Sequence, residues 1–266
     1  MANTDSVTRL YNGRHTASFR NSTHRYYIDG KLKPGVTTIM SKVLAKEGLM
    51  LWPLNMAIQF LEQIVPGVVL SEDLEDAKKA YIKRRDAGAD VGTIVHEAVE
   101  KILQGEEVGS LTGEALLAVN AFRAWQKKVN PEVIAVEKVV YSAEDDYAGT
   151  FDSILKIDDK VYLTDLKTTN ASRSAPEGIY AENFIQLGAY WSAYEEQRLF
   201  ELHHDNVTEL VPIDDLLILS CKKNGQVHTR KASEFGLSTL DCAEMWRCTQ
   251  SLHKDLQALK DKLGSK

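Results

Sequence analysis

The chain has 266 residues and a formal net charge of −6, with 44% hydrophobic and 26% charged residues. This composition is typical of globular proteins, and the length indicates one large domain or one core with helical additions. There is no long apolar run and no signal-peptide pattern at the N-terminus, so we expect a cytoplasmic protein without a membrane partner. The negative charge excludes a general attraction to nucleic acid, so any such binding needs local basic segments.

The basic segments and the cysteines narrow the possible classes of protein further. Basic residues gather in three segments that could contact nucleic acid, although such segments are more often solvated faces: 78–85, 127–128 and 222–223. The three cysteines, Cys221, Cys242 and Cys248, form an odd number, which argues against a disulfide framework. They are also one fewer than the usual four-thiolate site requires, so no iron–sulfur cluster is expected.

The first part of the chain, residues 1–130, is predicted to be mainly helical. It opens with a short β-hairpin around Asp29 and Gly30, followed by a helix that starts near Thr37 or Thr38. Proline, glycine and asparagine then delimit further predicted helices: 53–65, 71–105 with a candidate break at Gly88, and 112–130.

The second part, residues 131–266, is predicted to be an α/β unit. Its β-rich segments are 132–142, 149–157, 160–168 and a hairpin joined at Asn224 and Gly225. Helical periodicity returns over 176–199 and again from about Thr239 to Leu263. No linker or repeat separates the two parts, so a single domain spanning 1–266 is expected.

Two aspartates interrupt β-forming sequence between Tyr147 and Asn170, although strands disfavour Asp. If the hairpin turns at Asp158 and Asp159, paired residue numbers sum to 317, and Asp152 faces Asp165 across the strands. Two carboxylates at that separation repel by about 3 kcal/mol at an effective dielectric near 20. A bound cation would turn this repulsion between the carboxylates into attraction to the cation. The alternative is that both aspartates lie on a solvated strand surface.

Other polar residues fall at positions that could complete a site. Lys167 lies on the same strand face as Asp165 because strand side chains alternate. His96 lies at the edge of an apolar helical stripe, where a histidine is more often structural. Gln186 and Tyr190 are side by side on a helix at i and i+4.

The order "GTIVHE", "GTFD", "DLK", "QLGAY" between Gly92 and Tyr190 resembles the PD-(D/E)XK nuclease superfamily and, within it, RecB-type exonuclease domains. The segment "GVTTIMSKVL" is more weakly similar to phage recombination exonucleases and the mitochondrial genome maintenance exonuclease. This resemblance implies a restriction-endonuclease-like core, a central mixed β-sheet flanked by helices, with a helical N-terminal extension. No motif position departs from the family pattern.

The resemblance also implies residue roles. It assigns metal binding to the side chains of His96, Asp152 and Asp165 and to the backbone carbonyl of Leu166. It makes Lys167 the catalytic lysine, while Gln186 and Tyr190 border the site and help to hold the DNA strand. Oxygen ligands suit Mg²⁺ or Mn²⁺, and an imidazole among them favours tolerance of Mn²⁺.

Two glutamates are candidates for a supporting role. A two-residue turn at Glu144 and Asp145 would make paired numbers sum to 289, which places Glu137 beside Asp152. Glu137 would then be a second-metal or water-holding carboxylate, and a surface glutamate is an equal alternative. Glu100, one helical turn from His96, is the weaker candidate.

The leading hypothesis is a metal-dependent DNA exonuclease that acts on linear ends, single- or double-stranded, in recombination or repair. The resemblance favours a phage-encoded protein in a bacterial or phage-infected cell, with a single-strand-annealing protein as a candidate partner, and it leaves room for an oligomer. Alternatives are a structure-specific endonuclease of the same fold, a catalytically idle DNA-binding module and a non-nuclease α/β enzyme. Aromatic residues could stack on bases or pack the helical part: Tyr26, Tyr27, Trp52 and Phe60.

Overall fold

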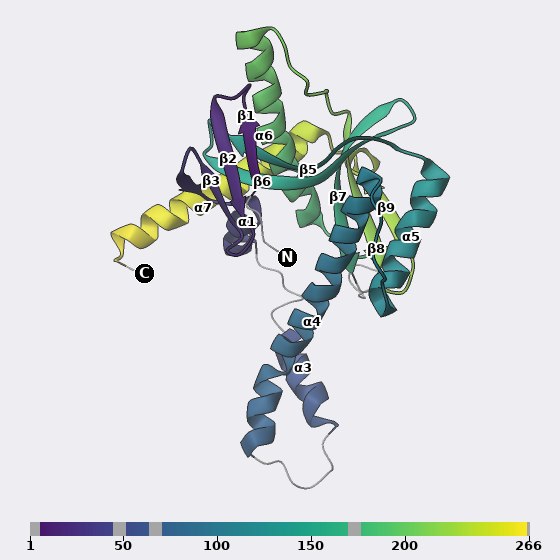
Figure 1. Cartoon of the computed structure of the whole chain (residues 1–266). Helices are drawn as coiled ribbons and strands as arrows, with labels where there is room; N and C mark the ends of the chain where they lie inside the picture. Colours follow the sequence, from purple (N-terminus) through teal and green to yellow (C-terminus); the bar gives the residue numbers. More distant parts are fainter. Residues whose placement is uncertain (1–5, 45–51, 64–70, 170–176, 265–266) are drawn as a thin grey trace.

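The computed structural model describes residues 6–44, 52–63, 71–169 and 177–264. At its centre is a mixed sheet with the strand order β5-β6-β7-β8-β9 (Figure 1). The strands are β5 (Glu132–Ser142), β6 (Tyr147–Ile157), β7 (Lys160–Thr169), β8 (Asp215–Lys222) and β9 (Val227–Lys231). Only the β7–β8 pair is parallel, and β8 is buried along its whole length, as its continuous apolar run predicts.

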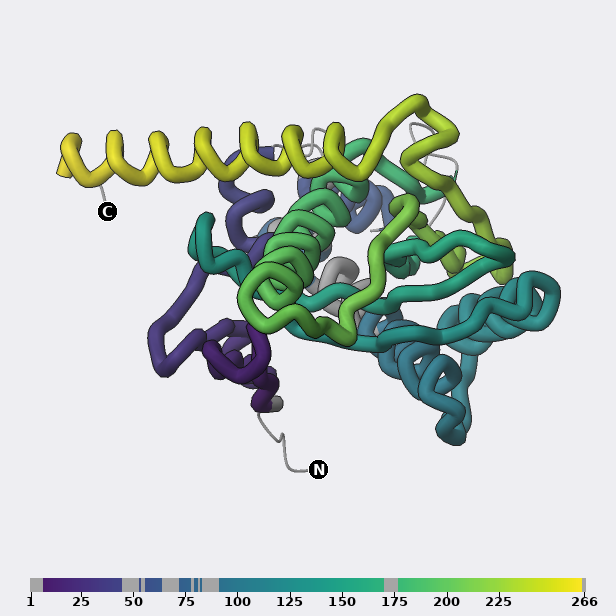
Figure 2. The backbone as a smooth tube through the Cα atoms, turned by 90° about the horizontal axis from the view of Figure 1, so that it is seen from above, coloured from purple at the N-terminus to yellow at the C-terminus, as the bar shows by residue number. Residues whose placement is uncertain are grey.

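Helices cover both faces of this sheet. One face carries α1 (Val36–Val43), α6 (Ala181–Asp205) and α7 (Thr239–Lys262); the other carries α4 (Ser71–Gln104) and α5 (Gly113–Val129). Figure 2 shows α7 as a long straight helix that crosses α6 on the outer side. Trp246 and Tyr147 are fully buried in the first layer, and Phe122 is fully buried in the second. The predicted fold class is therefore confirmed: a mixed sheet flanked by helices, with a helical extension.

A four-stranded antiparallel sheet precedes the helical part, which the expectation of a mainly helical first half missed. Its strands are β1 (Ser6–Leu10), β2 (His15–Arg20), β3 (Arg25–Ile28) and β4 (Lys31–Lys33). The predicted hairpin at Asp29 and Gly30 joins β3 to β4. The first two strands were not predicted because Ser, Thr, Arg and His dominate them, which leaves too few apolar residues for a clear alternation.

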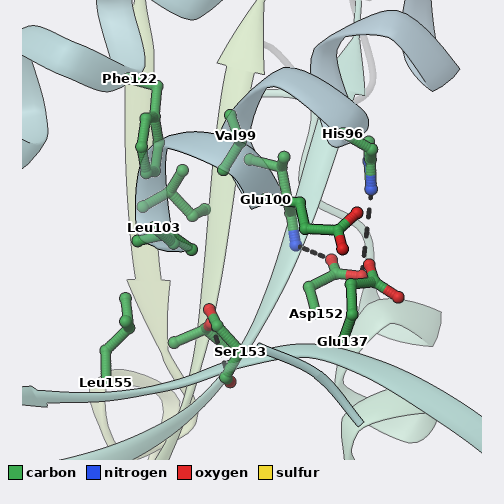
Figure 3. Close-up of a pocket in the computed structure, with 12 residues that line it drawn as sticks. His96, Val99, Glu100, Leu103, Phe122, Glu137, Asp152, Ser153 and Leu155 are labelled. Atoms are coloured by element: carbon green, nitrogen blue, oxygen red, sulfur yellow. Dashed lines mark hydrogen bonds and ion pairs between the residues drawn. The ribbon is translucent and has the colours of Figure 1, made fainter. Parts of the chain in front are cut away.

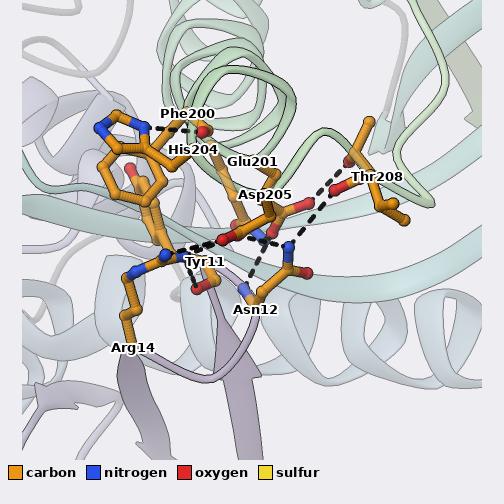
Figure 4. Close-up of polar contacts among 10 residues, drawn as sticks. Tyr11, Asn12, Arg14, Phe200, Glu201, His204, Asp205 and Thr208 are labelled. Atoms are coloured by element: carbon orange, nitrogen blue, oxygen red, sulfur yellow. Dashed lines mark hydrogen bonds and ion pairs between the residues drawn. The ribbon is translucent and has the colours of Figure 1, made fainter.

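Polar contacts attach the β1–β2 turn to the end of α6 (Figure 4). The Arg14 guanidinium donates to both oxygens of Asp205, each at 2.7 Å, and the Asn12 amide side chain donates to Asp205 at 2.8 Å. The backbone N–H of Asn12 donates to buried Glu201 at 3.1 Å, and Thr208 donates to the same carboxylate at 2.6 Å. This bidentate pairing fixes the orientation of the N-terminal sheet against the core.

The helices α3 (Trp52–Leu61) and α4 lie side by side and extend away from the sheet as an arm (Figure 1). The helix α4 runs unbroken through Gly88, so the candidate break there is wrong; a single helical glycine costs only about 1 kcal/mol. The side chains of Trp52 and of the basic residues 83–85 lie outside the described residues. In the described part of the chain, no helix combines the length and apolar character needed to cross a membrane.

Other predicted boundaries are close to those observed. The first helix begins at Val36, after Gly35, rather than at Thr37 or Thr38. Asn130 ends α5, as predicted, and adopts a left-handed conformation. The Asn224–Gly225 hairpin joins β8 to β9, and the small 3₁₀ helix η1 (Ala232–Phe235) follows.

Candidate active site

The hairpin register agrees with the sequence-based prediction. Residues pair from Ile157 with Lys160 to Ser153 with Thr164, so paired numbers sum to 317. The ladder ends there, one residue before the aspartates, and the backbone N–H of Leu166 donates to Asp152 Oδ2 at 2.5 Å. The carboxylate of Asp152 is therefore oriented by the backbone of β7, while its side chain keeps access to solvent.

A continuous polar chain leads from Asp165 to α6. The Lys167 Nζ lies 2.5 Å from Asp165 Oδ2 and donates to Gln186 Oε1 at 3.0 Å. Gln186 Nε2 in turn donates to the Tyr190 hydroxyl at 2.8 Å. The geometry thus brings together four residues that the sequence predicted for one site.

Asp165 is buried, with an exposed fraction of 2%. Burial raises the pKa of its carboxyl to about 6, against the opposing charge of Lys167, and the negative charge of Asp152 raises it further. Among the described residues, Asp165 Oδ2 has the charge of Lys167 beside it but accepts no hydrogen bond of good geometry. This oxygen retains unused acceptor capacity.

His96 approaches the same carboxylates from α4. Its Nδ1 lies 3.9 Å from Asp152 Oδ1. Figure 3 shows the carboxylates of Glu100, Glu137 and Asp152 turned toward one another beside the His96 ring. These side chains share a small pocket with an apolar floor made by Leu155, Phe122 and neighbouring residues.

Glu137 occupies the position that the β5–β6 register predicts. Val136 pairs with Ser153 and Lys138 with Phe151, so paired numbers sum to 289, although the turn spans four residues, 143–146. Glu137 has a φ of +48°, a left-handed conformation that is rare for a glutamate inside a strand. Desolvation by the surrounding protein, followed by the charges of Asp152 and Glu100, raises its pKa to about 8, although the residue keeps an exposed surface.

Glu100 is the carboxylate that α4 contributes to this pocket. It lines the pocket, and the Gln104 side chain donates to its Oε1 at 3.2 Å. It lies near enough to Glu137 to raise the pKa of that carboxyl. Glu100 is thus a neighbour of the site.

The glycine of "GTFD" allows Tyr190 to reach the site. A Cβ atom added to Gly149 would lie 2.5 Å from Tyr190 Cε1 and 3.1 Å from Val36 Cγ2. Contacts this short do not occur between real atoms, so a side chain here would displace the tyrosine. The motif therefore requires glycine at position 149, because the Tyr190 ring packs directly against its backbone.

Sequence reasoning did not connect the N-terminal sheet with the site. The Tyr26 hydroxyl lies 3.0 Å from Thr150 Oγ1, two residues before Asp152. Burial raises the pKa of Tyr26, and the charges of Glu137 and Asp152 contribute to the shift. The sequence indicates only a stacking or packing role for Tyr26, because no spacing in it links this residue to Thr150.

The donor set suits a divalent cation, although the side chains are not gathered around one point. Within the described residues, no three His, Cys, Asp or Glu side chains converge on a geometry that could hold a metal ion. Asp165 turns to Lys167, whereas Asp152 turns to Leu166 and His96. Clustered carboxylates with raised pKa values and the open acceptor of Asp165 fit a hard cation such as Mg²⁺.

No family model and no curated protein match the sequence. Among solved structures, the chain is similar to the crystal structure of SSO0001, with 12% identity, a TM-score of 0.34 and coverage of 78% of this chain and 87% of that one. It is also similar to an alkaline exonuclease (LHK-Exo) from Laribacter hongkongensis, with 10% identity, a TM-score of 0.29 and coverage of 80% and 98%. These scores are too low to carry a functional assignment.

Proposed function

We propose that the protein is a metal-dependent nuclease that hydrolyses phosphodiester bonds in DNA. The observation that carries the proposal is the polar chain from Asp165 through Lys167 and Gln186 to Tyr190, next to Asp152 and His96. An ammonium held against the buried carboxylate of Asp165 is suited to a reaction in which negative charge develops on phosphate oxygens. A solvated strand surface would not bury Asp165.

Each residue has a physical role in this proposal. Asp152, Asp165, Glu137 and His96, with the carbonyl of Leu166, would hold Mg²⁺ or Mn²⁺, which when bound polarises a phosphoryl oxygen and lowers the pKa of water. Lys167 positions the attacking water and offsets charge on the phosphorus oxygens. Gln186 orients the ammonium of Lys167, and Tyr190 orients the amide of Gln186. Residues that restrict a catalytic group in this way support the rate through preorganisation.

The finer proposal is an exonuclease that acts on the ends of linear DNA in recombination or repair. The sequence resemblance to RecB-type exonuclease domains supports it, as it supports a phage origin and an annealing-protein partner.

Digestion of end-labelled linear and covalently closed circular DNA tests the proposal. We expect wild-type protein with Mg²⁺ or Mn²⁺ to degrade only the linear form, and chelator to stop the reaction. Lys167→Ala should lose the activity, whereas Lys160→Ala, which removes an exposed ammonium from the same strand, should retain it. Cutting of closed circles would favour the endonuclease alternative, and no cutting of either form would contradict a DNA nuclease.

A further inference from the structure

Positive charge is concentrated at the start of this acidic chain. Residues 6–44 contain seven Lys and Arg residues and one carboxylate, Asp29, whereas the whole chain has a net charge of −6. Arg14 and Lys33 are ion-paired, to Asp205 and Asp146 respectively. The other five have no ion pair within the described residues: Arg9, Arg20, Arg25, Lys31 and Lys42.

The N-terminal sheet places three of these residues, Arg9, Arg20 and Arg25, on one face. Alternation along each strand and the observed register place one set of side chains on the inner face, where Leu10, Ala17 and Ile28 are buried. The opposite face carries Val7, Arg9, Thr16, Ser18, Arg20, Arg25, Tyr27 and Leu32. This set, which we call the outer face, contains three arginines and no carboxylate.

Tyr27 and Arg20 form a preorganised pair on the outer face. The Arg20 guanidinium carbon lies 4.2 Å from the centre of the Tyr27 ring, the geometry of a cation–π contact. Arg25 lies directly opposite Arg20 on the neighbouring strand. A planar guanidinium held over an aromatic ring offers a stacking surface for a nucleobase, and the adjacent arginines can reach phosphates.

The outer face belongs to an element that touches the candidate active site. Tyr26, the residue before Tyr27, contacts Thr150 beside Asp152, and its ring packs 4.7 Å from that of Phe19. The rival basic segment 222–223 is less available, because Lys222 is buried and donates to Gln226 and Lys223 lies 3.4 Å from Glu114. The N-terminal sheet is thus both charged and adjacent to the carboxylates.

We propose that the outer face binds single-stranded nucleic acid, with Arg9, Arg20 and Arg25 contacting phosphates and Tyr27 with Arg20 stacking on a base. The inference deepens the proposed function, because it rests on nucleic acid being the substrate and places a binding surface outside the catalytic carboxylates. Single strands are favoured over duplex because stacking needs unpaired base faces. Binding at this face needs neither the metal nor the cleavage step.

Fluorescence anisotropy with a labelled twenty-nucleotide oligothymidylate in chelator tests the proposal. Arg20→Ala/Arg25→Ala should weaken binding, and it should reduce the slope of log K against log salt by about 1.4, the value for two phosphate contacts on a single strand. Lys260→Ala/Lys262→Ala is the matched control, because it removes the same charge from the exposed end of α7. An equal loss of binding affinity in both double variants would show that only the net charge of the protein matters, and it would overturn the proposal.

The stacking contribution has its own variant. Tyr27→Ala should weaken binding by about 5- to 150-fold, while Tyr27→Phe, which keeps the ring, should bind like wild type. Circular dichroism confirms that each variant is folded, and if Tyr27→Ala unfolds, the arginine variant still decides the question. Absence of wild-type binding, or equally tight binding of a blunt duplex, would also overturn the proposal.

The two proposals fail separately. If the wild type cuts DNA and the arginine variant binds and cuts normally, the binding role of the outer face is refuted and the nuclease proposal stands. If the wild type never cuts DNA but the arginine variant loses oligonucleotide binding, the nuclease proposal is refuted and the binding role of the outer face stands.

Discussion

Glu137 is held in a conformation that its own sequence preference opposes. A left-handed φ in a non-glycine residue costs about 1 to 3 kcal/mol unless its surroundings compensate, and such strain gathers at functional sites. Here it accompanies a carboxylate placed beside Asp152 and Glu100, in a region already rich in negative charge. We infer that the backbone conformation serves to aim this carboxylate into the site.

The raised pKa of Glu137 predicts how stability changes with pH. Because the folded-state pKa, about 8, is above the usual value of 4.5, the favourable contribution is complete at low pH and is lost as pH rises through about 8. In chelator, we expect the melting temperature of the wild type to fall between about pH 6.5 and 8, above the pKa of Asp165.

Glu137→Gln should flatten that dependence and raise the melting temperature at pH 8, because it removes a partly desolvated charge beside Asp152 and Glu100. Differential scanning fluorimetry across the pH range measures both effects, and Glu132→Gln on the same strand serves as the control because Glu132 does not line the pocket. An identical pH profile for wild type and Glu137→Gln would contradict the assignment.

In the proposed mechanism, Gln186 acts by orienting Lys167, which donates to its side chain. Gln186→Ala should lower the cleavage rate about 10- to 100-fold, the usual range for residues that orient a site, with little change in KM. The reason is that Lys167 loses its acceptor at 3.0 Å and samples other orientations. Single-turnover kinetics measure the effect, with Gln257→Ala on α7 as control; an unchanged rate would remove Gln186 from the mechanism.

At the scale of elements, glycine controls how closely two helices approach. A Cβ atom at Gly188 of α6 would lie 2.2 Å from the backbone carbonyl oxygen of Cys242 on α7, which cannot move as a flexible side chain can. The glycine of "QLGAY" therefore permits the α6–α7 crossing, which in turn supports the helix that presents Gln186 and Tyr190 to the site.

Gly188→Ala should lower the free energy of unfolding by about 1 to 3 kcal/mol, the usual cost of overpacking. Gly92→Ala on α4 is the matched control, because an added Cβ there meets no atom within 4 Å and alanine should stabilise a helix by about 0.5 to 1 kcal/mol. Urea denaturation measures both variants, and equal stability of the two would show that the helices can separate at no cost.

Strands with a strong β-forming sequence pattern could be predicted from the sequence. Both hairpin registers in the central sheet could be predicted, because long β-forming runs flank short turns near Asp158 and Glu144. These registers place Glu137 and Asp152 correctly, but the end of the β6–β7 ladder could not be foreseen. The ladder ends at Ser153 and Thr164, next to the contact in which Asp152 accepts from the backbone N–H of Leu166, and strand propensity does not predict such a side-chain contact.

At the scale of the whole molecule, the site is assembled from segments far apart in the sequence. His96 comes from α4, Asp152 and Asp165 from the β6–β7 hairpin, and Gln186 from α6. The motif order predicted this set, since each motif lies within one element. Tyr26 and the outer face were not predicted, because their role depends on how the N-terminal sheet packs against β5 and β6.

The central claim is that Asp152 and its neighbours form a site that cleaves DNA with a divalent metal. The most direct measurement is the cleavage rate of end-labelled linear DNA with Mn²⁺ for Asp152→Asn and Asp158→Asn side by side. Asp158 is exposed in the turn of the same hairpin at a φ of +54°, which asparagine tolerates, so it controls for charge and folding. We expect Asp152→Asn to be at least about a hundredfold slower and Asp158→Asn to match wild type; equal rates for both variants would contradict the site.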